Sequence, residues 1–228
     1  MGDKNMRPNS LHDFQSMLAK IYADHNKRTY GFSALYALQL NRGIGIVSEC
    51  LRKDNGDKEI IRKLPLIFGW LMALWNDLDI DIENVTWHKF PGICPYCRVT
   101  QNCLCIADEK KYDEKESLNV YRRDHSHRPK TLSDWQTLHM KIYGRVNKIK
   151  MRVQVWDHFV EEFGEVCAEM LLERRKELEN ECADVMMWLL AFCNRISVNL
   201  DELTWQKYPG ECNACQKEQC ECPRIAFE

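Results

Sequence analysis

Apolar residues recur at helical spacing along most of the chain, most clearly in its second half. There the period predicts helices over residues 133–148, 151–176 and 177–196. The stretch NLDELTWQKYPG at 199–210 adds a short helix that Pro209 and Gly210 would end. Because we find no convincing strand pattern, the sequence predicts an all-α fold.

Two stretches match so closely that they indicate a tandem duplication of a helical unit of about 100 residues. TWHKFPGICPYC at 86–97 matches TWQKYPGECNAC at 204–215 at seven of twelve positions. Upstream, WLMALWN at 70–76 matches WLLAFCN at 188–194 in the same register.

The charged segment between the repeats predicts a linker. IADEKKYDEKESLNVYRRDHSHRPK at 106–130 is dense in charge and lacks apolar periodicity, although part of it could form a helix. The predicted domains are therefore a first unit over 1–105, this linker, and a second unit over 131–228.

The charge and hydropathy of the chain exclude some classes of function. Lys and Arg number 32 and Asp and Glu 34, so the formal net charge is -2 and no global positive field points to nucleic acid or an anionic membrane surface. The most apolar run, at 64–75, is too short to span a bilayer, and the N-terminal MGDKNMRPNS lacks the apolar core of a signal peptide. We therefore expect a cytoplasmic protein that binds neither membrane nor nucleic acid.

Eight of the twelve cysteines fall into two matching clusters, C-x2-C-x5-C-x-C and C-x2-C-x4-C-x-C. The members are Cys94, Cys97, Cys103, Cys105, Cys212, Cys215, Cys220 and Cys222. Four thiolates from a short loop are the number that a tetrahedral zinc ion takes, so each cluster predicts a structural zinc site. Reduced cysteines without metal, local disulfides and an iron-sulfur cluster remain alternatives.

Two acidic pairs lie on successive predicted helices among apolar residues. Glu162 and Glu165 stand three residues apart in EEFGEV, and Glu181 and Asp184 do so in ENECADV. Because residues three apart share a helix face, antiparallel packing would bring the four carboxylates together. Such oxygen ligands suit Mg2+ or Mn2+. The alternative is a solvated helix face whose acids pair with the nearby ERRK charges.

The order of these motifs resembles the MazG-type all-α nucleoside triphosphate pyrophosphohydrolases, relatives of the dimeric dUTPases. E-x2-E is followed about fifteen residues later by E-x2-D, then by an apolar helix, the turn LDEL, a lysine and a proline. The resemblance covers residues 132–210 well and 10–92 only through the internal repeat. The cysteine loops are not a general feature of that family, so they mark a subgroup and leave their purpose open.

This resemblance implies hydrolysis of a nucleoside triphosphate to a monophosphate and pyrophosphate at a metal held by the four acids. A carboxylate not fully engaged by the metal, Glu161 or Glu165, would take the proton of the attacking water. Two lysines would offset the charge of the phosphates. An asparagine stands at a position where the family often has Asp or Asn. Two tryptophans would stack on the base, unless they pack in the core. These substrate-binding candidates are Lys207, Lys141, Asn194, Trp135 and Trp156.

The first half departs from the acidic motif. The repeat alignment places Arg42 and Gly45 opposite the first acidic pair and Lys63 and Leu66 opposite the second, which removes the metal site. Pro65 should also kink or shorten the third helix of that half. Because the family works as dimers, the resemblance implies that this half is a built-in partner. The two halves would form an intrachain pseudo-dimer with a four-helix core, and the chain could self-associate further. Arg42 and Lys63 would contact phosphates or stay solvated.

Three functions are therefore considered. The first is the metal-dependent pyrophosphohydrolase. The second is a nucleotide-binding protein that signals occupancy with little turnover, and the third is an interaction module whose zinc loops grip a partner on a helical scaffold. The clustered acids disfavour the third, because a scaffold has no need of them. The sequence identifies neither the base, the sugar nor the phosphorus attacked.

Overall fold

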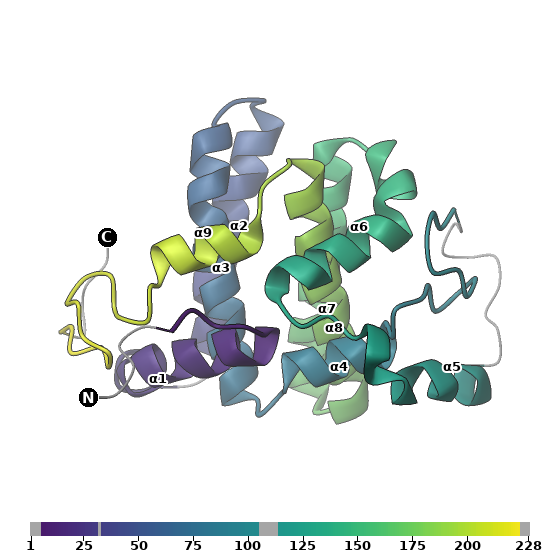
Figure 1. Cartoon of the computed structure of the whole chain (residues 1–228). Helices are drawn as coiled ribbons and strands as arrows, with labels where there is room; N and C mark the ends of the chain where they lie inside the picture. The colour runs from purple at the N-terminus through teal and green to yellow at the C-terminus, as the bar shows by residue number, and fades with distance from the viewer. Residues whose placement is uncertain (1–5, 32, 105–113, 224–228) are drawn as a thin grey trace. The chain divides into compact units, whose positions relative to one another are not determined.

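The computed structural model describes residues 6–31, 33–104 and 114–223, and every regular element among them is a helix (Figure 1). This confirms the predicted all-α class. The elements are α1 (Leu11–Thr29), α2 (Ser33–Arg52), α3 (Asp57–Asp77), α4 (Ile82–Lys89), α5 (Glu114–Arg123), the 3-10 turn η1 (His125–His127), α6 (Leu132–Lys148), α7 (Arg152–Leu172), α8 (Arg175–Arg195) and α9 (Leu200–Lys207). Among these described helices, none is both long and apolar enough to cross a membrane.

Local sequence signals set several helix ends. Ser10 and Thr131 begin α1 and α6 in the same way, because each side chain accepts the N–H of an aspartate three residues on, which in turn accepts the cap's own N–H. α7 ends before the predicted residue 176, because Glu173 adopts a left-handed conformation with φ 54°. Only Glu173 and Arg174 separate α7 from α8, so these two helices form a hairpin.

The charged linker is partly helical in its described part, which contains α5 and η1, while residues 105–113 lie outside the described residues. The C-terminal end of α5 is fixed on α4. Trp87 Nε1 donates to the carbonyl oxygen of Arg122 at 3.1 Å, and Arg122 Nε donates to the carbonyl oxygen of His88 at 2.7 Å. This end of the linker is therefore held by structure and is no free tether.

Pro65 does not shorten α3, so that part of the prediction is wrong. The helix has 21 residues, as α8 does, and Pro65 is buried within it. Pro65 lacks the N–H of a helical residue, but its apolar ring and the buried Leu64 and Phe68 beside it gain packing in the core. Burial of this face outweighs the lost hydrogen bond.

The compact units of the structure divide the chain differently from the two repeats. One consists of Met1–Asp81 with Leu200–Glu228, and the other of Ile82–Asn199. In the first, which we call unit 1, α3 packs with α1, α2 and α9; in the second, unit 2, α8 packs with α6, α7 and α4 (Figure 1). Each unit therefore takes three long helices from one repeat and the short helix and cysteine loop from the other.

Matching hydrogen bonds show that the two units follow one plan. In unit 1 the Gln15 side chain donates to a carbonyl just after α3 at 2.7 Å, and Asn76 Nδ2 donates to the Gln15 carbonyl at 3.2 Å. In unit 2 the equivalent Gln136 donates to a carbonyl just after α8 at 2.6 Å, and Asn194 Nδ2 donates to the Gln136 carbonyl at 2.9 Å. The first helix is thus tied to the third in the same way twice.

The exchanged cysteine loops are also anchored at equivalent points. The Cys220 N–H donates to the Ile21 carbonyl of α1 at 2.8 Å, and the Cys103 N–H donates to the Ile142 carbonyl of α6 at 2.7 Å. Both isoleucine side chains are buried against cysteines of the loop that they hold. The loop of each repeat therefore completes the core of the unit that carries the other repeat's long helices.

Candidate functional site

Carboxylates from both arms of the α7–α8 hairpin converge in unit 2. α7 carries Glu162 and Glu165 one turn apart, and α8 carries Glu181 and Asp184 with the same spacing. One carboxylate oxygen from each of Glu162, Glu165 and Glu181 lies within 4.8 Å of the others. Such a group of oxygens could hold a metal ion, because hard cations take carboxylate ligands at short range.

The fourth carboxylate, Asp184, is held by a lysine from the other repeat. Lys89, the last residue of α4, forms an ion pair with Asp184 and also donates to the Asn180 carbonyl at 3.3 Å. The two side chains are only 23% and 16% exposed, so the pair is well shielded from water. Exchange of α4 into unit 2 therefore brings a cation to the acidic cluster, which we define as Glu162, Glu165, Glu181 and Asp184.

Burial and mutual repulsion raise the pKa of every carboxyl group in the acidic cluster. For Glu162, burial raises the pKa most, and the charges of Asp184, Glu165 and Glu181 raise it further, to about 8. Burial also leads the rise for the other three, against the opposing effect of Lys89. Burial alone would lower the pKa of Lys89, but Asp184 and Glu181 outweigh it and raise the pKa. The cluster thus holds more carboxyl groups than the one lysine can pair with.

An aromatic and cationic rim lies beside the acidic cluster. Trp188 Nε1 donates to Glu162 Oε1 at 3.2 Å, and the His158 ring stacks on Trp188 with centroids 4.3 Å apart at 18°. Lys150 Nζ lies 4.9 Å from the centre of the Trp188 ring and 3.0 Å from His158 Nε2. Tyr96, from the exchanged cysteine loop, is near enough for the charge of Asp184 to add to the effect of burial in raising its pKa. Flat ligand groups and anions can both be accommodated by such a rim.

The two candidates for a general base differ in position. Glu165 belongs to the acidic cluster and is exposed at the surface of α7. The side chain of Glu161 is 63% exposed, and its carboxylate lies 3.3 Å from His158 Nδ1. Glu165 is therefore placed to act on a water at the cluster, whereas Glu161 interacts with the rim.

The two tryptophans predicted to stack on a base are completely buried in unit 2. Trp156 packs against Phe159 and Phe192, with ring centroids 4.7 and 4.8 Å apart, and Trp135 contacts Trp87 at 6.2 Å. Both have 0% exposure, so neither presents a ring face to a ligand. The core-packing interpretation describes both of them.

Asn194 also has a structural position. Its side chain bonds the Gln136 backbone and side chain, and the equivalent Asn76 donates to the Gln15 carbonyl in unit 1, where the acids are absent. Because the contact is also present in the unit without the acidic cluster, Asn194 has a structural role that does not depend on a substrate. Lys141 is exposed on α6, and its carbonyl accepts the Asn102 N–H of the first cysteine loop at 3.0 Å.

Lys207 lies in unit 1, where it lines a cavity with residues of α1, α2 and α3. The lysine at the acidic cluster is its repeat equivalent, Lys89, which was not predicted as a site residue. Trp188, His158 and Lys150 were not predicted either. The lysine shared by TWHK and TWQK pointed to Lys89. However, the sequence does not show whether the short helix of a repeat packs on its own long helices or on those of the other repeat.

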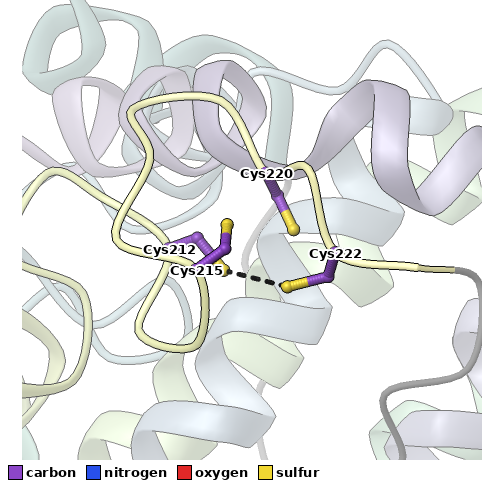
Figure 2. Close-up of side chains that lie close together, drawn as sticks. All are labelled: Cys212, Cys215, Cys220 and Cys222. Atoms are coloured by element: carbon purple, nitrogen blue, oxygen red, sulfur yellow. Dashed lines mark hydrogen bonds between the residues drawn. The ribbon is translucent and has the colours of Figure 1, made fainter.

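The second cysteine loop brings its four sulfur atoms together (Figure 2). Cys212 Sγ and Cys222 Sγ are 3.8 Å apart, and the backbone N–H groups of Cys215 and Ala214 bond the Cys212 thiol. Burial alone would raise the pKa of Cys212, but these N–H groups and the Cys220 thiol outweigh it and lower the pKa to about 7. A thiol that ionises easily beside three others is suited to holding a metal ion.

The first cysteine loop has the same local backbone. The residue after the second cysteine, Arg98 in one loop and Gln216 in the other, has φ 63° or 56° and donates its N–H to the carbonyl of the first cysteine at 2.9 or 2.8 Å. Cys103 Sγ lies 3.4 Å from Cys94 Sγ and 3.5 Å from Cys97 Sγ. Cys105, the predicted fourth ligand, lies outside the described residues. Each loop therefore has thiols that could hold a metal ion.

Comparison of the chain with known protein families, with curated proteins and with solved structures finds no match. The geometry of the acidic cluster, the rim and the cysteine loops therefore carries the functional argument.

Proposed function

We propose that unit 2 is a metal-dependent nucleoside triphosphate pyrophosphohydrolase that releases a monophosphate and pyrophosphate. The observation that carries this proposal is the convergence of Glu162, Glu165 and Glu181 within 4.8 Å beside the Lys89–Asp184 pair. It agrees with the resemblance of the acidic motif to the MazG-type enzymes, and it supplies both ligands for a dication and a cation for phosphate.

The donor set fits Mg2+ or Mn2+. All the ligands are carboxylates, and the raised pKa of Glu162, caused by burial and by its acidic neighbours, is the strain that a bound dication would relieve. When bound, the metal would polarise phosphate oxygens and acidify a water molecule. Glu162, Glu165, Glu181 and Asp184 would hold it in place.

Side chains of unit 2 would carry the remaining tasks. Glu165, exposed at the edge of the acidic cluster, would accept the proton of the attacking water, with Glu161 as the alternative. Lys89 would exchange its contact with Asp184 for the triphosphate, the role that the resemblance assigned to Lys207. The partly exposed Trp188 and His158, which stack on each other, would receive the base in place of Trp135 and Trp156.

The cysteine loops would bind structural zinc, about two ions per chain, because each loop brings thiols together on a tight turn. Elemental analysis of the purified protein tests this directly, and a protein free of zinc would contradict it. We also retain the intrachain pseudo-dimer of MazG-like repeats around a four-helix core as part of the proposal. Exchange of α4 and α9 supports it, because each repeat contributes a short helix to the unit that holds the long helices of the other repeat.

A nucleotide-binding protein with little turnover is the second candidate. The observation that favours it is the Lys89–Asp184 pair, because an ion-paired fourth carboxylate is a weaker metal ligand than a free one. Binding without release of pyrophosphate would distinguish this candidate from the enzyme.

The test is a screen of nucleoside triphosphates with Mg2+ or Mn2+, read out as released pyrophosphate. We expect Glu162→Gln and Glu181→Gln to lower the rate by about 100-fold or more, because loss of a metal ligand costs at least as much as loss of an outer-shell partner. Glu179→Gln is the matched control, since Glu179 lies on the same helix and pairs with Arg175 outside the acidic cluster. Equal rates in all three variants would refute the assigned site.

A further inference from the structure

Unit 1 has a cavity at the repeat equivalent of the acidic cluster. Its volume is about 390 Å3, and its walls include Arg42, Lys63 and Leu66, which stand opposite Glu162, Glu181 and Asp184 in the repeat. At the repeat position of the acidic cluster, unit 1 therefore has a hollow of ligand size with basic side chains in place of acids.

The described lining of this cavity contains basic side chains and no Asp or Glu. Arg42 comes from α2, Lys63 and Arg62 from α3, and Lys207 from the exchanged α9, with His25 of α1 beside them. Four permanent cations from three helices focus positive potential on one concave surface. A dication would be repelled there, and an anion would be attracted.

Acidic neighbours neutralise this charge only in part. Glu59 accepts two hydrogen bonds from Arg62, at 2.8 and 2.6 Å, and lies 3.6 Å from Lys63 Nζ. Arg42 and Lys207 form no ion pair with any residue in the described part of the chain. The charges of these two side chains are therefore available to a ligand, and phosphate groups could neutralise them.

The other walls of the cavity are aromatic and apolar. Trp70 stands at the position of Trp188 in the repeat, is partly exposed, and contacts Tyr30 edge to face at 5.3 Å. Tyr22 and Tyr208 meet at 5.7 Å across the part formed by α1 and α9. The amides of Asn26 and Gln39 add hydrogen-bonding groups among these rings. A ligand with a flat ring and a chain of phosphates would satisfy both kinds of wall.

We propose that this cavity binds a nucleotide without a divalent metal ion, with its phosphates at Arg42, Lys63 and Lys207 and its base against Trp70. The degenerate repeat is then a second nucleotide site. Its lysine comes from α9 of the C-terminal repeat, as the lysine of the acidic cluster comes from α4 of the N-terminal repeat. This inference does not depend on turnover in unit 2.

The test is calorimetric titration of the full chain with the four ribonucleoside triphosphates, without added divalent cations. The protein carries Glu162→Gln and Glu181→Gln, so that the acidic cluster cannot contribute. We expect saturable binding that weakens as salt rises, and at least tenfold weaker binding after Arg42→Gln or Lys63→Gln. The matched controls Arg52→Gln on α2 and Lys58→Gln on α3 lie outside the lining and should leave the affinity unchanged.

Three results would overturn the proposal. The first is the absence of binding at millimolar nucleotide, and the second is equal weakening by the lining and control variants. The third is binding of pyrophosphate as tight as that of every triphosphate, which would leave the aromatic wall without a function. Circular dichroism of each variant confirms that it is folded. Failure of this site would leave the pyrophosphate-release test of unit 2 untouched.

Discussion

Lys89 and Lys207 occupy the same position in the two repeats but meet opposite surroundings. Lys89 pairs with Asp184 in a cluster of acids, while Lys207 lines a cavity that is already basic. The surroundings of each lysine therefore depend on which long helices its short helix packs against. The lysine is common to both repeats, and in our proposal the charges around it decide whether the site binds a metal ion or an anion.

His139 provides a residue-scale prediction about pH. It is fully buried on α6, its Nδ1 atom lies 3.4 Å from Asn194 Nδ2, and burial lowers its pKa to about 3. The unfolded chain takes up this proton near pH 6.5 and the folded chain does not, so stability is lost as the pH falls below 6.5 towards 3. Between pH 7 and pH 5 this single group should cost about 2 kcal/mol.

Urea denaturation at both pH values checks this prediction. His139→Leu, which copies Leu18 at the equivalent position of unit 1, should remove that part of the acid loss. Identical pH dependence in the wild type and the variant would contradict the prediction, because His139 would then take up its proton equally in the folded and unfolded chains.

At the scale of the helices, the sequence predicted more of the fold than of the site. Periodicity placed α6 and α8 within two residues of their observed ends, because buried stripes and caps are local signals. The expected shortening of α3 at Pro65 was wrong, because burial of Pro65 and its neighbours outweighed the local effect of proline. The four acids were found from their spacing, but Lys89 and Trp188 were not, since they depend on which elements pack together.

Gly69 provides an element-scale prediction about the contact between α3 and α9. A Cβ atom at Gly69 would lie 2.9 Å from the Tyr208 hydroxyl and 3.2 Å from its ring, and Tyr208 is buried. We therefore expect Gly69→Ala to destabilise the protein by about 1–3 kcal/mol through overpacking. Gly45→Ala on α2 meets nothing within 4 Å and should stabilise by about 0.5–1 kcal/mol through helix propensity. Thermal unfolding of both variants measures the difference, and equal stabilisation would contradict the packing of α9 on α3.

At the scale of the whole molecule, the exchange makes the compact units cross the boundaries of the repeats. Unit 2 is one continuous stretch, Ile82–Asn199, whereas the second repeat alone, 131–228, lacks α4 and the first cysteine loop. Without them, the apolar surface of α8 that α4 covers would be exposed to water.

Two fragments test this organisation. Residues 82–199 should unfold cooperatively on heating, because they contain a complete core, and residues 131–228 should aggregate or unfold without a clear transition. Circular dichroism with size-exclusion chromatography distinguishes the two. A folded, monomeric 131–228 fragment beside an unfolded 82–199 fragment would show that each repeat folds with its own tail.

Turnover of two matched variants tests most directly whether the acids of one repeat and the lysine of the other form one catalytic centre. Pyrophosphate release is measured with Mg2+ for the full chain and for Lys89→Gln and Lys207→Gln, at the triphosphate concentration that gives the highest wild-type rate. We predict turnover by the wild type, a loss of about 100-fold in Lys89→Gln from the missing charge at the phosphates, and a rate within about twofold of wild type in Lys207→Gln. A wild-type protein that releases no pyrophosphate, or a loss confined to Lys207→Gln, would contradict the account.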